Sequence, residues 1–375
     1  MSEQLHQHDV AHERRTRHPW RHRWSTHGPV LSAALLVGAL VLAAATAAGD
    51  QGPTPRPGDE AAAAPAGEID LLTGVTDGEP PAVPFLRRDD LVWPNQMVLD
   101  LPRVYDQFGL VGDRAYAVYD ARGRRVLHVL DSAGVRIGRH LVEAGVAFDA
   151  EQADGSDVVA WATPRGVIRT RWEGGRWSFG NQGGPVTVAA VMAGDSCGAG
   201  DDCRVYVNNV DGRPPQWVSP DGTVGRVARR AVRVNDVAAD GTVAYQISSS
   251  DTGSCSGVRD ADGLRWRTCD HSLLRFSPDG RLVLATEPYR DGLGMATLAV
   301  LDADTGEPLV QYRITGGFIA QAGWEDADHP LVVVSGPDGW LLLRLGTDGR
   351  RELAAGPVAP RADPTFRLLA LPGVP

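Results

Sequence analysis

The chain has 375 residues with 43% apolar residues, which is enough for one large domain with a hydrophobic core and a tail. Its net charge of −10 is uneven, because residues 1–28 carry +2 and the remaining residues carry −12. The acidic main part has no electrostatic reason to bind nucleic acid, so we expect no nucleic-acid partner.

An uncharged segment, residues 29–48, follows a tail that is rich in His and Arg, residues 1–28. About 20 residues of helix span the hydrocarbon core of a bilayer. Five arginines precede the segment and Asp50 follows it, and such an excess of arginine marks the cytoplasmic side. The sequence therefore predicts a single-pass protein of the cell membrane, with a cytoplasmic N-terminus and an extracytoplasmic main domain.

A cleaved signal peptide is the alternative for the same segment. Ala45-Thr46-Ala47 fits the small residues of a cleavage site, and cleavage would yield a secreted protein. The apolar stretch is longer than a signal core of about 7–15 residues, which favours the uncleaved anchor.

Residues 49–67 are rich in Pro, Ala and Gly and show no apolar periodicity. This composition is typical of an extended linker. We therefore expect the folded domain to cover residues 68–375.

The main domain shows short β-rich runs instead of a sustained helical period. Turns with Asp and Gly, such as Pro220-Asp221-Gly222 and Pro278-Asp279-Gly280, separate the runs, and these residues tolerate the backbone of tight reversals. The predicted strands are Tyr116–Tyr119, Val126–Leu130, Val158–Ala162, Val167–Trp172, Val186–Val191, Val205–Val207, Thr242–Ile247, Leu282–Thr286, Thr297–Leu301, Leu331–Val334 and Trp340–Leu345.

A longer repeat indicates an all-β propeller of four-stranded blades. Similar units begin near Val104, Val146, Thr187, Val232, Leu273 and Ala320. The two ends of the domain, residues 69–102 and 366–371, together make about one more unit. Pairing between the last strand and the first would close the ring and leave no open seam. We expect seven blades, with six or eight as alternatives.

Four cysteines, Cys197, Cys203, Cys255 and Cys269, lie in the expected exported part, and their even number predicts two disulfides. Three pairings are possible. Local spacing favours Cys197 with Cys203, across a short flexible loop, and Cys255 with Cys269. The latter two fall opposite each other when residues are counted outward from Asp262 in a predicted hairpin. A zinc site is the alternative, but no C-x-x-C spacing is present.

Three segments carry a resemblance to known propellers. Residues 276–284 (FSPDGRLVL) resemble the repeat core of WD40-like and TolB-like propellers, and residues 301–309 (LDADTGEPL) resemble quinoprotein-type repeats. Residues 266–270 (WRTCD), which run into the first of these, are similar to membrane-anchored WD40-repeat proteins of actinobacteria, a group largely without assigned function. The resemblance implies the fold. The Gly-His and Trp-Asp dipeptide motifs of true WD40 repeats are absent from the sequence.

No set of residues in the sequence makes up a catalytic, cofactor or metal site, so we expect a protein that is not an enzyme and needs no cofactor. The pairs His8/His12 and His18/His22 have an i,i+4 spacing that suits a metal, but no Cys or carboxylate framework accompanies them. Trp172 and Trp177 flank a predicted hairpin turn and are expected to be the most exposed Trp pair, and so to form a contact surface. The leading hypothesis is a protein-interaction scaffold with a partner in the cell envelope. The alternative is a glycan or small-ligand receptor, or a hydrolase, that uses the central channel.

Overall fold

The computed structural model divides into two units, residues 1–60 and residues 61–375. It describes residues 67–149, 158–193, 197–198, 202–289, 294–361 and 363–369. The predicted anchor, residues 29–48, lies outside the described residues. No helix in the described ranges is long and apolar enough to cross a membrane.

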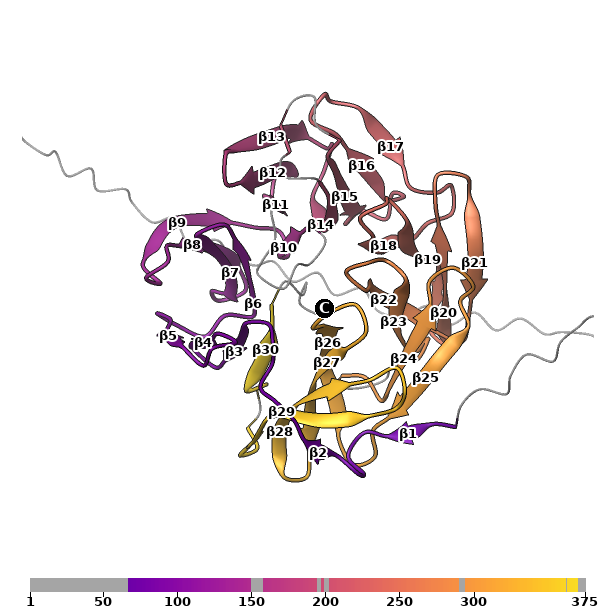
Figure 1. Ribbon diagram of the computed structural model, residues 1–375. Coiled ribbons are helices and arrows are strands. Elements are labelled where there is room, and N and C mark those ends of the chain that lie inside the picture. Colours follow the sequence, from indigo (N-terminus) through magenta and orange to yellow (C-terminus); the bar gives the residue numbers. More distant parts are fainter. Residues whose placement is uncertain are drawn as a thin grey trace, which may run out of the picture. The chain divides into compact units, whose positions relative to one another are not determined.

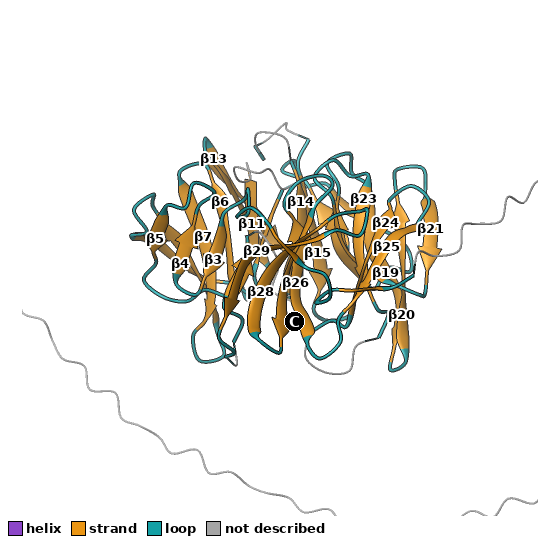
Figure 2. Cartoon of the chain, turned by 60° about the horizontal axis from the view of Figure 1, so that its bottom comes forward, coloured by secondary structure: helices purple, strands orange, loops and turns teal. Residues whose placement is uncertain are grey.

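The described chain forms seven separate β-sheets arranged around a ring (Figure 1). Within each sheet, strands that follow one another in the chain are antiparallel, and their order proceeds from the centre of the ring to its rim. Figure 2 shows the ring from another side, with the strands crossing its thickness. The structure is therefore a seven-bladed propeller, which confirms the preferred blade number.

Five blades have four strands each. The strands are given from the innermost outward. One blade contains β30 (Phe366–Leu368), β3 (Phe85–Arg87), β4 (Asp90–Val92) and β5 (Val98–Asp100), and the next contains β6 (Gln107–Val111), β7 (Arg114–Asp120), β8 (Arg125–Leu130) and β9 (Arg136–Leu141). The following three blades contain β10 (Val146–Phe148), β11 (Val158–Ala162), β12 (Val167–Trp172) and β13 (Gly175–Asn181); β14 (Val186–Met192), β15 (Arg204–Asn209), β16 (Gln216–Val218) and β17 (Val224–Arg226); and β18 (Arg233–Val237), β19 (Val243–Ser250), β20 (Gly253–Arg259) and β21 (Leu264–Thr268).

The other two blades carry a fifth, outermost strand. They are β22 (Ser272–Phe276), β23 (Leu282–Thr286), β24 (Thr297–Asp302), β25 (Pro308–Arg313) and β1 (Ile69–Asp70); and β26 (Phe318–Trp324), β27 (Pro330–Gly336), β28 (Gly339–Leu345), β29 (Arg351–Val358) and β2 (Thr76–Asp77). Both β1 and β2 pair in parallel with their neighbours.

The ring closes as the sequence predicts, by pairing between its two ends. Strand β30 lies antiparallel to β3, with Arg87 opposite Phe366 and Phe85 opposite Leu368. We call the sheet of β30, β3, β4 and β5 the closing blade. One detail of the prediction is wrong, because β1 and β2 belong to other blades and only residues from Phe85 onward enter the closing blade. Strands of two residues are too short to show a side-chain alternation, so the sequence does not reveal their partners.

The predicted strands and turns are otherwise confirmed, except that Thr242 precedes β19 by one residue. In the turn between β22 and β23, Gly280 has a φ of +75°, and the Asp279 carboxylate accepts hydrogen bonds from the Ser277 hydroxyl and the Arg281 N–H. This explains the Ser-Pro-Asp-Gly sequence, since Gly supplies the left-handed backbone and Asp satisfies nearby donors.

The hydrophobic core lies between neighbouring blades. Each blade turns one face of Val, Leu and aromatic side chains toward the next, so that most clusters of buried residues draw on two adjacent sheets. Trp324 and Trp340 are among the largest residues buried in this way.

A polar contact is buried in the interior between the closing blade and the next blade. His128 in β8 is only 2% exposed, and its Nδ1 lies 3.0 Å from the hydroxyl of Tyr105, which is fully buried. Burial, together with the charges of Arg103, Arg136 and Arg139, lowers the pKa of His128 to about 4. Burial raises the pKa of Tyr105 to about 12.

This depressed histidine pKa predicts a loss of stability in acid. Between pH 6.5, the ordinary histidine pKa, and pH 4, the unfolded chain binds a proton at His128 that the folded chain does not bind. Stability therefore falls as the pH falls through this window, by about 3 kcal/mol from this residue. Urea unfolding of the full chain in mild detergent at pH 7 and pH 4 should show this loss, and a His128→Gln variant should lose that much less. Equal losses in both proteins would contradict the prediction.

Candidate interaction surface

A groove lies at the rim of the ring, where the blade of β10–β13 meets the blade of β14–β17. It has a volume of about 260 Å³. We call it the Trp177 groove. Its lining residues come from β13, from the segment that follows β13 and from the β16–β17 hairpin: Trp177, Ser178, Phe179, Gly180, Gln182, Val218, Pro220, Asp221, Gly222 and Val224.

The β12–β13 hairpin brings the two predicted tryptophans to one face of their blade. Trp172 pairs with Gly175, and Trp177 pairs with Thr170, two positions along β12 from Trp172. Because side chains alternate between the faces of a strand, both rings lie on the same face. That face packs on the core shared with the next blade, which also contains the ring of Phe179, 6.5 Å from the Trp177 ring.

Both tryptophans are half-buried, so the expectation that they form an exposed pair is wrong. The reason is packing, because the hairpin lays both rings against the apolar side chains of the neighbouring blade. None of the eight tryptophans between residues 68 and 375 is exposed. Trp177 still lines the groove, whereas Trp172 does not. Trp172 instead packs against Gly175, the first residue of β13.

The groove combines an apolar wall with a fixed carboxylate. Asp221 accepts hydrogen bonds of 2.8 Å from both the backbone N–H and the hydroxyl of Thr223. These bonds, led by the one from the Thr223 backbone, lower the pKa of Asp221 and keep it charged at neutral pH. The groove can therefore accept an apolar group beside a hydrogen-bond donor or a cation.

Strand β13 also presents a free edge beside the groove. It is the last strand of its sheet, and no described residue pairs with its outer side. Strands β1 and β2 cover the outer edges of two other blades, whereas β13 is one of five outermost strands that stay uncovered in the described chain. An open edge has unpaired N–H and C=O groups that accept a further strand.

Both predicted disulfides are confirmed. Cys255 lies opposite Cys269 at the end of the β20–β21 hairpin, with their Cα atoms 4.1 Å apart. The second bridge joins Cys197 and Cys203, with Cα atoms 5.1 Å apart, and both residues are buried in the core that supports Trp172 and Trp177. Disulfides persist in oxidising compartments, so they hint at a domain outside the cytoplasm.

In the parts of the chain that the structure describes, no group of three or more His, Cys, Asp or Glu side chains is placed to hold a metal ion. The acidic side chains of the turns serve other roles there. Asp326 accepts from the backbone N–H groups of Asp328 and His329, and Asp260 pairs with Arg265.

A second pocket was not indicated by any sequence pattern. It lies beside the closing strand β30, and its residues come from both ends of the propeller sequence: Arg88, Val104, Arg361, Asp363, Pro364, Thr365 and Arg367. We call it the Arg pocket. No local motif could have predicted it, because Arg88 and Arg361 become neighbours only when the ring closes.

No protein-family model matches the chain, and no curated protein sequence matches it. Among solved structures, it is similar to the β-propeller domain of Cps50 (Swd1) from Myceliophteria thermophila, with 8% identity and a TM-score of 0.45 over 67% of this chain and 86% of that chain. It is similar to a chain of a mitotic checkpoint complex, with 9% identity and a TM-score of 0.47 over 79% and 88% of the two chains. A computationally designed protein, Ika8, shows 13% identity and a TM-score of 0.46 over 75% and 87%.

Proposed function

We propose that this chain is a non-enzymatic interaction scaffold, anchored in the cell membrane and exposed on its outer side, that binds a partner protein at the Trp177 groove. The observation that carries the proposal is the free edge of β13 directly beside a groove with an aromatic wall. A rigid ring holds this edge in place. The partner would be a protein of the cell envelope.

The chemistry of the groove favours an extended segment of the partner. Such a segment would add to the β13 edge through backbone hydrogen bonds, which is a common mode of peptide recognition. An apolar side chain would pack against Trp177, and a Lys or Arg would pair with Asp221. The blades that carry β1 and β2 support the idea, because in this fold their outer edges already accept short parallel strands.

The location outside the cytoplasmic membrane is part of the proposal. Two disulfides support an oxidising compartment. The uncharged segment at residues 29–48, with arginines before it, supports an anchor with the propeller on the outer side.

Binding should depend on the Trp177 side chain. We expect Trp177→Ala to weaken the partner's affinity by about 30-fold, because buried tryptophans at contact surfaces contribute about 2 kcal/mol or more. The full chain, immobilised in mild detergent, would first identify partners in envelope extracts. Titration of the purified partner onto wild type and variant would then give the affinities.

The matched control is Leu264→Ala. Leu264 is an exposed apolar residue in the outermost strand of another blade, away from the groove. Its replacement should leave the affinity unchanged. Equal affinities for wild type and Trp177→Ala, with both proteins folded by circular dichroism, would rule out the groove as the binding surface.

A further inference from the structure

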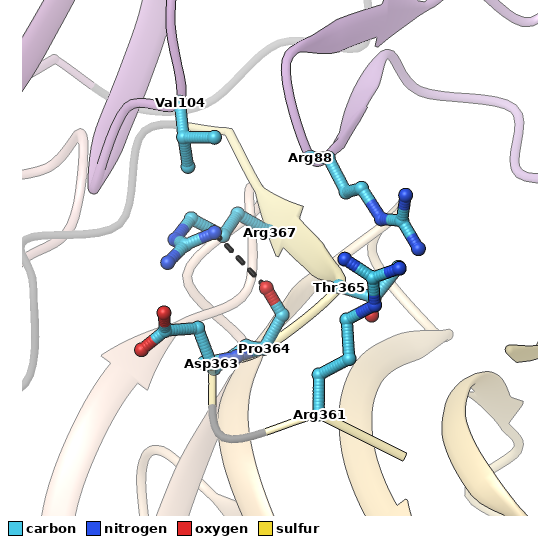
Figure 3. Close-up of a pocket in the computed structure, with 7 residues that line it drawn as sticks. All are labelled: Arg88, Val104, Arg361, Asp363, Pro364, Thr365 and Arg367. Atoms are coloured by element: carbon cyan, nitrogen blue, oxygen red, sulfur yellow. Dashed lines mark hydrogen bonds between the residues drawn. The ribbon is translucent and has the colours of Figure 1, made fainter. Parts of the chain in front are cut away.

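The Arg pocket is built from connections that meet at one end of the closing blade. Arg88 lies in the β3–β4 turn and Val104 in the β5–β6 connection. The other lining residues belong to the segment between β29 and β30 or to β30 itself (Figure 3). The pocket has a volume of about 170 Å³. It therefore lies at the place where the two ends of the propeller sequence join.

The charge of the pocket is unbalanced. Three arginines and one aspartate line it, so its formal charge is +2. Among the described residues, no carboxylate oxygen lies within 4 Å of a guanidinium nitrogen of Arg88, Arg361 or Arg367. Figure 3 shows the side chains of Arg88 and Arg361 extending toward the same part of the pocket, with Asp363 on the other side near Arg367. Like charges placed together in this way favour a bound anion.

Arg367 is the most buried of the three arginines. It is 8% exposed in β30, and burial lowers the pKa of its guanidinium, while the charges of Asp106 and Asp363 act in the opposite direction. Its Nη1 donates to the carbonyl oxygen of Pro364 at 3.0 Å, and no other described group accepts from it. A guanidinium carries five N–H donors, so the bond to Pro364 leaves others that can bind solvent or a ligand.

Thr365 contributes an unsatisfied buried group to the pocket. Its side chain is almost fully buried, and its hydroxyl oxygen has no hydrogen-bond partner among the described residues, although Thr365 lines the pocket. Its backbone carbonyl accepts from the N–H of Arg88 at 2.8 Å, which joins the β3–β4 turn to the segment before β30. Buried hydroxyls in native proteins nearly always have a partner.

We propose that the Arg pocket binds a phosphate group, as the free ion or as a phosphate monoester. The planar N–H fork of arginine matches the oxygens of phosphate, and a dianion neutralises the formal charge of +2. The ligand accepts hydrogen bonds from the arginines and from the Thr365 hydroxyl. Arg88 and Arg361 reach it from opposite ends of the sequence, so its binding stabilises the closure of the ring.

Calorimetric titration of the full chain in mild detergent, at low ionic strength, tests the site with two probes, inorganic phosphate and glycerol 3-phosphate. We expect one probe or both to bind with a stoichiometry of one and to raise the melting temperature. The Arg88→Gln and Arg361→Gln variants should each bind about tenfold more weakly or worse, since each removes charged hydrogen bonds. Tighter binding of one probe identifies the source as the free ion or an ester.

Arg361 and Arg88 suit this test because neither side chain makes a hydrogen bond or ion pair to a described residue. Their replacement therefore removes no such interaction from the folded protein. The matched control is Arg124→Gln, an exposed arginine in the β7–β8 turn of the next blade, which should bind as wild type does. The proposal is overturned when neither probe binds to the wild-type chain, or when both pocket variants bind as tightly as the control.

Discussion

Replacing Arg344 with Met is expected to destabilise the propeller by about 3–5 kcal/mol. Arg344 in β28 forms an ion pair with Glu325, whose side chain is 2% exposed. The variant leaves that carboxylate in the interior without its cation, and removal of one partner of a buried pair has a cost of this size. The hydrogen bonds to Glu325 also raise the pKa of Arg344, so the arginine stays charged at every pH at which the protein folds.

The ion pair also positions the chain segment between β2 and β3. Arg344 donates to the carbonyl oxygens of Glu79 and Pro80, each at 3.2 Å, and the Glu325 carboxylate accepts from the N–H of Ala82. This segment carries the chain from the rim of one blade to the closing blade. The loss of Arg344 should therefore loosen the entry into the closing blade as well as the core.

Urea unfolding at pH 7, followed by tryptophan fluorescence, measures the effect. The control is Arg350→Met, because Arg350 follows β28 in the same blade and pairs with Asp348, but both side chains are exposed. Such surface pairs contribute about 1 kcal/mol or less. If the Arg344→Met variant lost as little stability as the control variant, the buried pair would not stabilise the fold.

Phe366→Ala should destabilise the protein by a comparable amount, about 3–5 kcal/mol, which is typical for removing a buried phenylalanine ring. Phe366 in β30 is 1% exposed. Its ring lies 6.1 Å from that of Phe85 in β3, and both pack in a cluster with Trp340 of the preceding blade. The side chain thus contributes to the contact that closes the ring.

Hydrogen exchange measured by mass spectrometry separates loss of closure from general loss of stability. The control is Phe108→Ala, which removes an equally buried ring from the innermost strand of the next blade. We expect the amides of β30 and β3 to exchange faster in Phe366→Ala than in Phe108→Ala under native conditions. Equal protection of these strands in the two variants would argue against a special role of Phe366 in closure.

Features that depend on neighbours in the chain were predictable. The Asp-Gly turns, the strand runs and the register that places Cys255 opposite Cys269 follow from local backbone preferences and side-chain alternation. The repeat of similar units predicted the blade number, and the incomplete units at the two ends predicted the closure by β30 and β3. Ring closure could be inferred because an open seam would leave unpaired strand edges.

The candidate surfaces were harder to predict, because they depend on how blades lie against each other. Trp172 and Trp177 flank a turn, which suggested exposure, but the neighbouring blade covers much of both rings. Exposure depends on contacts across blades, and local sequence does not encode these contacts. The β16–β17 hairpin also lines the groove, but the sequence of this hairpin indicated only its turn and no binding surface.

The fold class, the blade repeat and the turns could be predicted from the sequence, which also favoured the observed disulfide pairing, since each arises from interactions within one hairpin or from a period along the chain. The folded arrangement was needed to establish where β1 and β2 pair, how far the tryptophans are buried and which arginines share a pocket. Those features join residues that are far apart in the chain, such as Arg88 and Arg361. Their proximity is set by closure of the ring, which no local pattern records.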